Sequence, residues 1–290
     1  MLGTLGRGSV AVVYLAKRQS DGKDVALKHV GGLPDSGTVD ATRKEFRTLQ
    51  LFRHPHIIQA FDFFAANNSF CLVLECFEGL TLSKAARKQP FPEPVALKLF
   101  RMLAGAVLTL HERRVVHRDV KPDNIMVSQD LTDLRLMDFN TAKRLTEGGS
   151  LSMTGTALFL PPEVQEGYET PSELSDIWSM GICLHFMLSG KLPRVKRCSS
   201  TAVYHEFVAN TQLQLDSGFL DGISDSCKRV LCQCLSIDKK NRTGLAQLLE
   251  KEWPQMPEET AFERSRSSGD PGQEPMSPCQ LTNWGRGASC

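Results

Sequence analysis

The sequence lacks an excess of charge of either sign. Its 34 lysines and arginines nearly balance its 33 aspartates and glutamates, and the formal net charge at pH 7 is +1. Proteins that bind nucleic acids or membrane surfaces usually carry an excess of basic residues. The balance argues against both classes, so neither a nucleic-acid partner nor a membrane partner is expected.

Long hydrophobic runs and targeting signals are also missing. No uninterrupted apolar run approaches about 18 residues, the length at which a membrane-spanning helix is expected. The first residues do not form a signal-peptide pattern, and Leu2 stands where N-myristoylation requires glycine. We expect a protein that is neither secreted nor transmembrane. The cytoplasm is its expected location, with the nucleus as the alternative.

Cysteine is present, but metal-binding and disulfide spacings are not. Among the nine cysteines the closest pair, Cys232 and Cys234, has neither the spacing of a zinc site nor that of a redox motif. The others are scattered singly, often inside apolar stretches where cysteine acts as a small hydrophobe. Free thiols in a reducing compartment are therefore expected.

The apolar pattern predicts strands first and helices later. Short β-branched and apolar runs predict strands at Ser9–Arg18, Lys23–Val30 and Phe70–Glu75. Apolar residues on one face predict a helix at Val39–Phe52. Further helices are expected at Pro94–Arg113, Leu174–Leu188, Asp225–Leu235 and Gly244–Glu250.

Two segments have a different character. The stretch Asp138–Gly167 reads as a long irregular loop, and a loop of that length in a compact domain is usually functional. The last residues, 255–290, are rich in serine, glycine, proline and charge. Such a composition cannot bury enough apolar surface to offset its ordering entropy, so we expect a disordered tail.

The most specific chemistry lies in the segment His117-Arg118-Asp119-Val120-Lys121-Pro122-Asp123-Asn124. An aspartate here can accept the proton of an incoming hydroxyl, and a lysine two residues later can neutralise charge on a transferring phosphoryl group. An asparagine further on can offer its carbonyl oxygen to a magnesium ion. The alternative is a polar turn between two helices, but this spacing rarely arises by chance.

This segment resembles the catalytic loop of the eukaryotic protein kinase family at every fixed position. Lys121 resembles the serine/threonine branch. The resemblance implies an α+β protein kinase fold over residues 1–254. A small antiparallel sheet with one helix would occupy about residues 1–77, and a mainly helical lobe about residues 78–254. The implied reaction moves the γ-phosphoryl group of ATP to Ser/Thr hydroxyls of protein substrates, with Mg²⁺, or alternatively Mn²⁺, as the metal.

The resemblance also implies a nucleotide site. Gly6-Arg7-Gly8-Ser9-Val10-Ala11-Val12-Val13 matches the family's glycine-rich loop, with Ala11 in place of the third glycine. Lys28 would grip the α- and β-phosphates and pair with Glu45. Glu75-Cys76-Phe77 would be the hinge beside the adenine, and Leu74 the gatekeeper. The implied ATP contacts are Leu5, Gly6, Arg7, Gly8, Ser9, Val10, Ala11, Val13, Ala26, Lys28, Leu74, Glu75, Phe77, Met126 and Asp138.

Met137-Asp138-Phe139-Asn140 occupies the place of the family's D-F-G motif. Asp138 and Asn124 would hold magnesium, a hard cation that prefers oxygen ligands. Asn140 replaces the glycine. Because asparagine tolerates a positive φ better than most residues, we expect it to adopt that conformation in glycine's place.

Thr154-Gly155-Thr156 and Pro161-Pro162-Glu163 match the end of the family's activation segment. By resemblance, Thr156 would bond Asp119 and Lys121. Structural roles are implied for three further residues, namely the pair Glu163 and Arg242 and the helix residue Asp176, which would anchor the catalytic loop.

Control by phosphorylation is expected at Ser152, with Ser150 and Thr154 as alternatives. Ser152 falls where related kinases carry an activating phosphate. Arg118 and Lys143 would form the phosphate pocket. The phosphate would come from an upstream kinase or from autophosphorylation.

A pseudokinase is the main alternative, since it would use the same fold to bind nucleotide or partners without turnover. Ala11, Asn140 and Ala60, where the family usually has a larger apolar residue, favour it. The intact set Lys28, Glu45, Asp119, Asn124 and Asp138 favours an active enzyme. A small-molecule kinase with this fold is disfavoured by the two activation-segment motifs.

Overall fold

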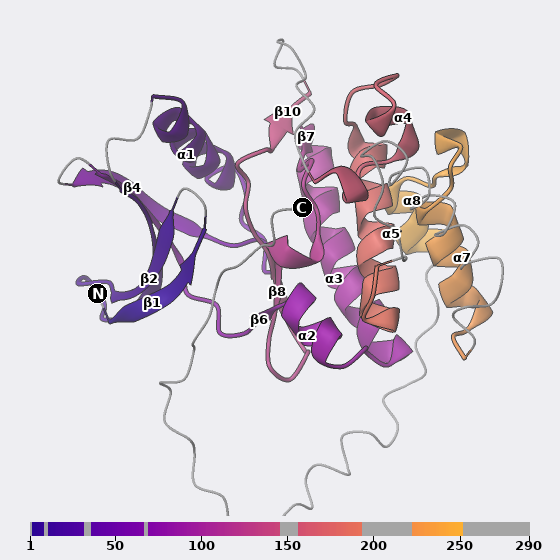
Figure 1. The fold of residues 1–290 in the computed structure, drawn as a ribbon, viewed down its shortest axis with the longest axis horizontal. Coiled ribbons are helices and arrows are strands. Elements are labelled where there is room, and N and C mark those ends of the chain that lie inside the picture. The colour runs from indigo at the N-terminus through magenta and orange to yellow at the C-terminus, as the bar shows by residue number, and fades with distance from the viewer. Residues whose placement is uncertain are drawn as a thin grey trace, which may run out of the picture.

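A computed structural model describes residues 2–8, 11–31, 36–66, 69–145, 156–192 and 222–251. They form a sheet-based lobe and a helical lobe, which lie side by side in Figure 1. The predicted two-lobed α+β fold is therefore confirmed. The predicted tail lies outside the described residues.

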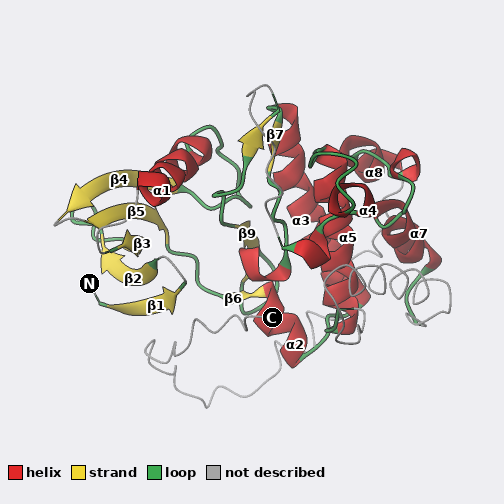
Figure 2. Ribbon diagram, turned by 45° about the horizontal axis from the view of Figure 1, so that its top comes forward, coloured by secondary structure: helices red, strands yellow, loops and turns green. Residues whose placement is uncertain are grey.

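The small lobe is a five-stranded antiparallel sheet with the strand order β1-β2-β3-β5-β4. Helix α1 (Ser36–Leu49) lies against β4 and β5, as Figure 2 shows. The strands are β1 (Gly3–Arg7), β2 (Val12–Lys17), β3 (Asp24–Val30), β4 (Ala60–Ala66) and β5 (Ser69–Glu75).

Element boundaries differ from those predicted. Helix α1 ends at Leu49 because the amides of Leu51 and Phe52 bond the carbonyl oxygens three residues back, which tightens the last turn. Strand β4 has no counterpart in the predictions. Two of its phenylalanines, Phe61 and Phe64, are about two-fifths exposed, so the strand lacks the usual alternation.

The helical lobe is built around α3 (Glu93–Glu112) and α5 (Glu173–Ser189). Helix α5 is buried on nearly every side, as its apolar composition predicts. A Cβ at Gly181 would lie only 2.7 Å from Cys234 Cβ, so the close packing of α5 requires glycine there. The other helices of this lobe within the described residues are α2 (Leu82–Lys88), α4 (Pro162–Gln165), α7 (Asp225–Cys234) and α8 (Leu245–Lys251).

In the described part of the chain, α3 is the one helix with the length and apolar composition of a membrane span. More than half of that stretch is buried within the fold, and its apolar residues belong to the main core. A buried core helix can have the same length and apolar composition.

Short strands lie where the two lobes meet. Strands β6 (Leu80–Thr81), β8 (Ile125–Val127) and β9 (Leu134–Leu136) form one small sheet. Strand β7 (Val115–Val116) pairs with β10 (Lys143–Arg144). The stretch 138–167, predicted to be irregular, thus contains β10 as well as α4 and a 3₁₀ turn at Ala157–Phe159.

The chain passes between the lobes at Gly79, which could not be another residue without a change in the backbone. A Cβ there would lie 2.1 Å from the carbonyl oxygen of Val127. Within the described residues, free thiols are found at Cys71, Cys76, Cys183, Cys227 and Cys234, which agrees with the prediction for those cysteines. Burial raises the pKa of Cys234 to about 12, so this thiol stays protonated.

Candidate active site

The catalytic loop is held by one buried carboxylate. Asp176, on α5, is 1% exposed and accepts hydrogen bonds from the backbone amides of His117 and Arg118, each at 2.9 Å. It also contacts His111 Nε2 at 2.9 Å. These bonds support the backbone at Arg118, whose φ is +68°. The predicted contact between Asp176 and the catalytic loop is present.

Asp119 lies at the centre of a polar network. Its Oδ2 is 2.7 Å from Lys121 Nζ. Its Oδ1 accepts from the Thr156 amide at 3.1 Å and from Thr156 Oγ1 at 3.2 Å. Lys121 Nζ in turn donates to Thr156 Oγ1 at 2.9 Å. The structure therefore brings together all three residues that the sequence pattern predicts to be in contact.

Asn124 is 6% exposed, and its amide nitrogen is fully used. Asn124 Nδ2 donates to the backbone oxygen and to Oδ2 of Asp119, both at 2.9 Å. This orientation leaves the side-chain carbonyl oxygen of Asn124 to accept other partners. Together with the Asp138 carboxylate, it provides the hard oxygen donors that Mg²⁺ prefers. The residues present fit a magnesium ion.

The backbone at Met137–Asn140 corrects one prediction. Among the described non-glycine residues with positive φ, Asp138 has a φ of +60°, whereas Asn140 is not one of them. Asn140 therefore does not replace glycine through its backbone. Instead its side chain turns back, and Asn140 Nδ2 donates to Asp138 Oδ1 at 2.5 Å. Sequence spacing gave no sign of this contact.

Lys28 and Glu45 form the predicted ion pair, with Lys28 Nζ 2.7 Å from Glu45 Oε2. Burial disfavours both charges, and it raises the pKa of Glu45. Burial alone would lower the pKa of Lys28, but the carboxylates of Glu45 and Asp138 outweigh it, so the pKa is raised. Lys28 is therefore a protonated cation in a site that also contains Asp138.

Phe139 anchors the segment that carries Asp138. Its side chain is fully buried, and its ring lies 4.8 Å from the His117 ring and 6.4 Å from the Phe52 ring, centroid to centroid. Ala60 belongs to the same core cluster. The small residue at position 60 thus leaves Phe139 buried.

Most of the predicted nucleotide contacts lie on β1, β2, β3 and β5, and Met126 lies on β8. The predicted contacts outside these strands, within the described residues, are Gly8, Ala11, Phe77 and Asp138. Val13 pairs with Lys28 across β2 and β3, and Ala26 pairs with Leu74 across β3 and β5. The Gly8 amide donates to the carbonyl oxygen of Ala11 at 2.8 Å, which closes the glycine-rich turn. Ser9 and Val10 lie outside the described residues.

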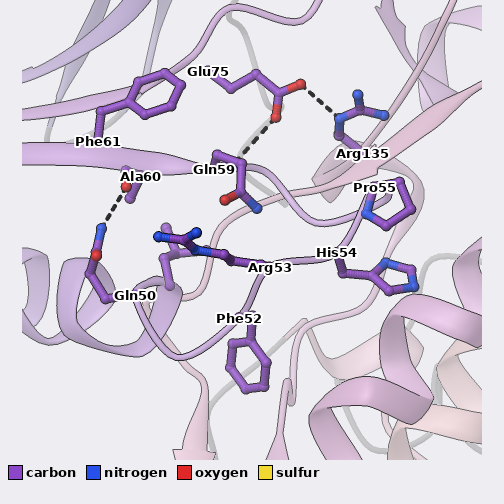
Figure 3. Close-up of a pocket in the computed structure, with 11 residues that line it drawn as sticks. Gln50, Phe52, Arg53, His54, Pro55, Gln59, Ala60, Phe61, Glu75 and Arg135 are labelled. Atoms are coloured by element: carbon purple, nitrogen blue, oxygen red, sulfur yellow. Dashed lines mark hydrogen bonds and ion pairs between the residues drawn. The ribbon is translucent and has the colours of Figure 1, made fainter.

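The sequence patterns do not indicate a contact made by Glu75, a residue of the predicted hinge, which Figure 3 shows. Arg135, on β9, bonds Glu75 Oε1 at 2.9 Å and Asp133 Oδ2 at 2.8 Å. Its guanidinium also covers the Phe77 ring at 4.7 Å. A charged residue between Leu134 and Leu136 was the only available signal.

Glu75 and Arg135 also line a pocket of about 540 Å³ beside the end of α1 and the start of β4. None of the predicted catalytic residues lines this pocket. It is therefore distinct from the site around Asp119.

The structure describes only part of the predicted phosphate pocket. Arg118 is 8% exposed, and its Nε donates to the carbonyl oxygen of Thr141 at 2.5 Å. Burial lowers the pKa of its guanidinium. Lys143 pairs with Val116 in the β10–β7 ladder. Ser150, Ser152 and Thr154 lie outside the described residues.

The predicted structural pair is present. Arg242 NH1 lies 2.5 Å from Glu163 Oε1, and NH2 lies 2.8 Å from Glu163 Oε2. The Arg242 side chain is fully buried and its guanidinium also covers the Trp178 ring at 5.0 Å. This bidentate pair ties α4 to the segment before α8.

Several known proteins are similar to this chain. A carbon catabolite-derepressing protein kinase of Candida tropicalis is 30% identical over 86% of the chain, which spans 40% of that protein. An Aurora kinase of Schizosaccharomyces pombe is 30% identical, with 86% of the chain and 69% of that protein covered. A serine/threonine-protein kinase of Myxococcus xanthus is 32% identical over 67% of the chain and 24% of its own length.

The family model described as "Protein kinase domain" matches residues 1–254. This range includes every element that carries the network around Asp119 and the Lys28–Glu45 ion pair. The match covers most of the sequence. The chain therefore belongs to the protein kinase family.

Proposed function

We propose that this chain transfers the γ-phosphoryl group of ATP to serine and threonine hydroxyls of protein substrates. The observation that carries the proposal is the polar network in which Lys121 and Thr156 both contact Asp119. This network presents a fixed carboxylate beside a cation, the arrangement needed to deprotonate a hydroxyl next to a negatively charged phosphoryl group.

Each residue has a separate task in this proposal. Asp119 accepts the proton of the substrate hydroxyl as that oxygen attacks the γ-phosphorus, and the bond from this phosphorus to the β-phosphate oxygen breaks to release ADP. Lys121 stabilises charge on the transferring group, and Thr156 fixes the rotamer of Asp119 through Oδ1. Lys28, held by Glu45, binds the α- and β-phosphates. Val13, Ala26 and Met126 sandwich the adenine, and Leu74 is the gatekeeper beside it.

Magnesium fits the oxygen donors of Asp138 and Asn124, and Mn²⁺ is the alternative. The bound cation would supply charge neutralisation for the β- and γ-phosphates. Asp138 stays near Lys28 because the burial of Phe139 fixes its backbone. Asn124 keeps its oxygen available because Asp119 engages its nitrogen.

Replacing Lys28 with methionine tests the nucleotide site. We expect at least about 10²-fold slower transfer, because a cation aimed at the phosphates is lost while the aliphatic stem is kept. Transfer of radiolabel from ATP to a Ser/Thr peptide library measures the rate. Lys23→Met, which removes an exposed lysine from the turn before β3, is the matched control.

Two outcomes would contradict the proposal. Full activity of a monodisperse Lys28→Met protein would remove the nucleotide assignment. Nucleotide binding by the unaltered chain with no transfer to any peptide would favour the pseudokinase alternative, which Ala11 already suggests.

We further propose that phosphorylation of Ser152, by an upstream kinase or by the chain itself, raises activity. Ser152→Ala should lower the activity of the phosphorylated enzyme about tenfold, because one charge-assisted bond to Arg118 or Lys143 contributes about 1.5–3 kcal/mol. Mass spectrometry and peptide assays measure phosphorylation and rate. A loss in Ser150→Ala or Thr154→Ala alone would instead move the site to that residue.

Protein substrates with Ser/Thr acceptors are the proposed partners, without nucleic acid or membrane. The cytoplasm is the proposed location, with the nucleus as the alternative. The net charge of +1 supports this set of partners, because it provides no general attraction for polyanions.

A further inference from the structure

Asn140 contacts the carboxylate that the proposed function assigns to the metal. Its Nδ2 lies 2.5 Å from Asp138 Oδ1. An N–H group that donates to an ionised carboxylate forms a charge-assisted bond, which is stronger than a bond between neutral groups. The glycine of a D-F-G motif has no side chain to make this contact. Asparagine thus adds a donor at the one carboxylate where a divalent cation needs lone pairs.

The backbone gives no competing reason for asparagine at this position. Asn140 is not among the described residues with positive φ, so the tolerance of asparagine for that conformation is not used. The residue with the unusual backbone is Asp138, at +60°. What distinguishes Asn140 from glycine here is therefore the side-chain amide and its bond to Asp138.

Asp138 does not depend on this bond for its position. Phe139 is fully buried between His117 and Phe52, which holds the adjacent backbone in place. The positive charge of Lys28 also interacts with Asp138, as the raised pKa of Lys28 reflects. Loss of the amide would consequently change what surrounds the carboxylate more than where the carboxylate lies.

The Asn140 amide and a divalent cation would both bind lone pairs of the Asp138 carboxylate. An ionised carboxylate offers about four lone-pair positions, and the Asn140 amide occupies one of them with the positive end of an N–H bond. A divalent ion that binds Oδ1 must displace this donor or approach it closely. Either event costs part of a charge-assisted hydrogen bond.

We propose that Asn140 is a positioning residue that competes with the divalent cation for Asp138 and so weakens metal binding. The inference rests on the proposed function, in which Asp138 is a metal ligand. Removing the amide should tighten metal binding about tenfold, equivalent to about 1.4 kcal/mol. Removal of the Asn140 amide should leave the fold unchanged and alter the surroundings of one metal ligand, Asp138.

Mn²⁺ titrated into the full chain, with a non-hydrolysable ATP analogue present, tests the inference without turnover. The electron paramagnetic resonance signal of free Mn²⁺ reports how much metal remains unbound. Asn140→Ala and Asn140→Leu both remove the donor, and the leucine variant keeps most of the volume. Asn241→Ala is the matched control, because Asn241 is an exposed asparagine on the 3₁₀ turn Lys239–Asn241. Melting temperatures check that each variant is folded.

We expect both Asn140 variants to bind Mn²⁺ about tenfold more tightly than the unaltered chain, with no shift for Asn241→Ala. Equal affinity in all proteins overturns the inference and leaves the proposed function intact. Weaker binding by both Asn140 variants also overturns it, because the amide would then support the carboxylate. If the unaltered chain binds the analogue but no protein binds Mn²⁺, both the inference and the metal assignment fail.

Discussion

Replacing Asp119 with asparagine should lower the rate of phosphoryl transfer by about 10²- to 10⁴-fold, the usual contribution of a general base. The variant keeps the shape of the side chain but loses the group that accepts the substrate proton. ATP affinity should remain, because Lys28, Asp138 and the residues around the adenine are unchanged. Single-turnover phosphoryl transfer and calorimetric titration of ATP measure the two quantities.

Asp130→Asn is the matched control for this experiment. Asp130 is an exposed aspartate in the turn between β8 and β9 and contacts Ser128. The same substitution there should leave transfer unchanged. A collapse of ATP binding in Asp119→Asn, together with the rate, would contradict the separation between the base and the nucleotide site.

Replacing Arg242 with alanine should reduce the free energy of unfolding by about 3–5 kcal/mol. The variant leaves the Glu163 carboxylate, which is 14% exposed, without its bidentate partner. It also removes the guanidinium that covers Trp178. For a domain of this size the loss corresponds to a melting temperature lower by about 6–20 °C. Urea unfolding monitored by circular dichroism measures the change.

Lys239→Ala gives the comparison for Arg242→Ala, since it breaks a neighbouring ion pair that is far more exposed. Lys239 and Glu169 are 40% and 35% exposed, so their pair should contribute less than about 1 kcal/mol. Equal, small effects of the two substitutions would show that burial of the Glu163–Arg242 pair does not matter for stability.

The sequence predicted the catalytic centre well because the motif residues contact one another. Lys121 and Thr156 contact Asp119, and Glu45 contacts Lys28, as predicted. Each of these residues has a charged or polar group that requires a specific partner, and the motif contains that partner too. Glu45 could be chosen since it is the only acidic residue in Ala41–Phe52. Polar groups that need specific partners therefore restrict the fold more than apolar patterns do.

The errors arose where a residue has more than one way to act. The sequence suggests a backbone role for Asn140, but in the structure its side chain donates a hydrogen bond to Asp138. Strand β4 was missed because Phe61 and Phe64 are partly exposed, which blurs the period of the strand. Arg135 was overlooked since its partners Glu75 and Asp133 are set by tertiary contacts, and no local pattern indicates them.

The contacts of β9 join the two lobes at neighbouring points. The large lobe holds the small one at Glu75, through Arg135, and at the segment before β4, where the amides of Ile58 and Leu136 bond Leu136 and His56. The Glu75 amide bonds the carbonyl oxygen of Gln59, so these two attachments lie side by side. Attachments this close together can act as a hinge, so we expect any change in the angle between the lobes to occur about these contacts and to leave the bonds of β9 intact.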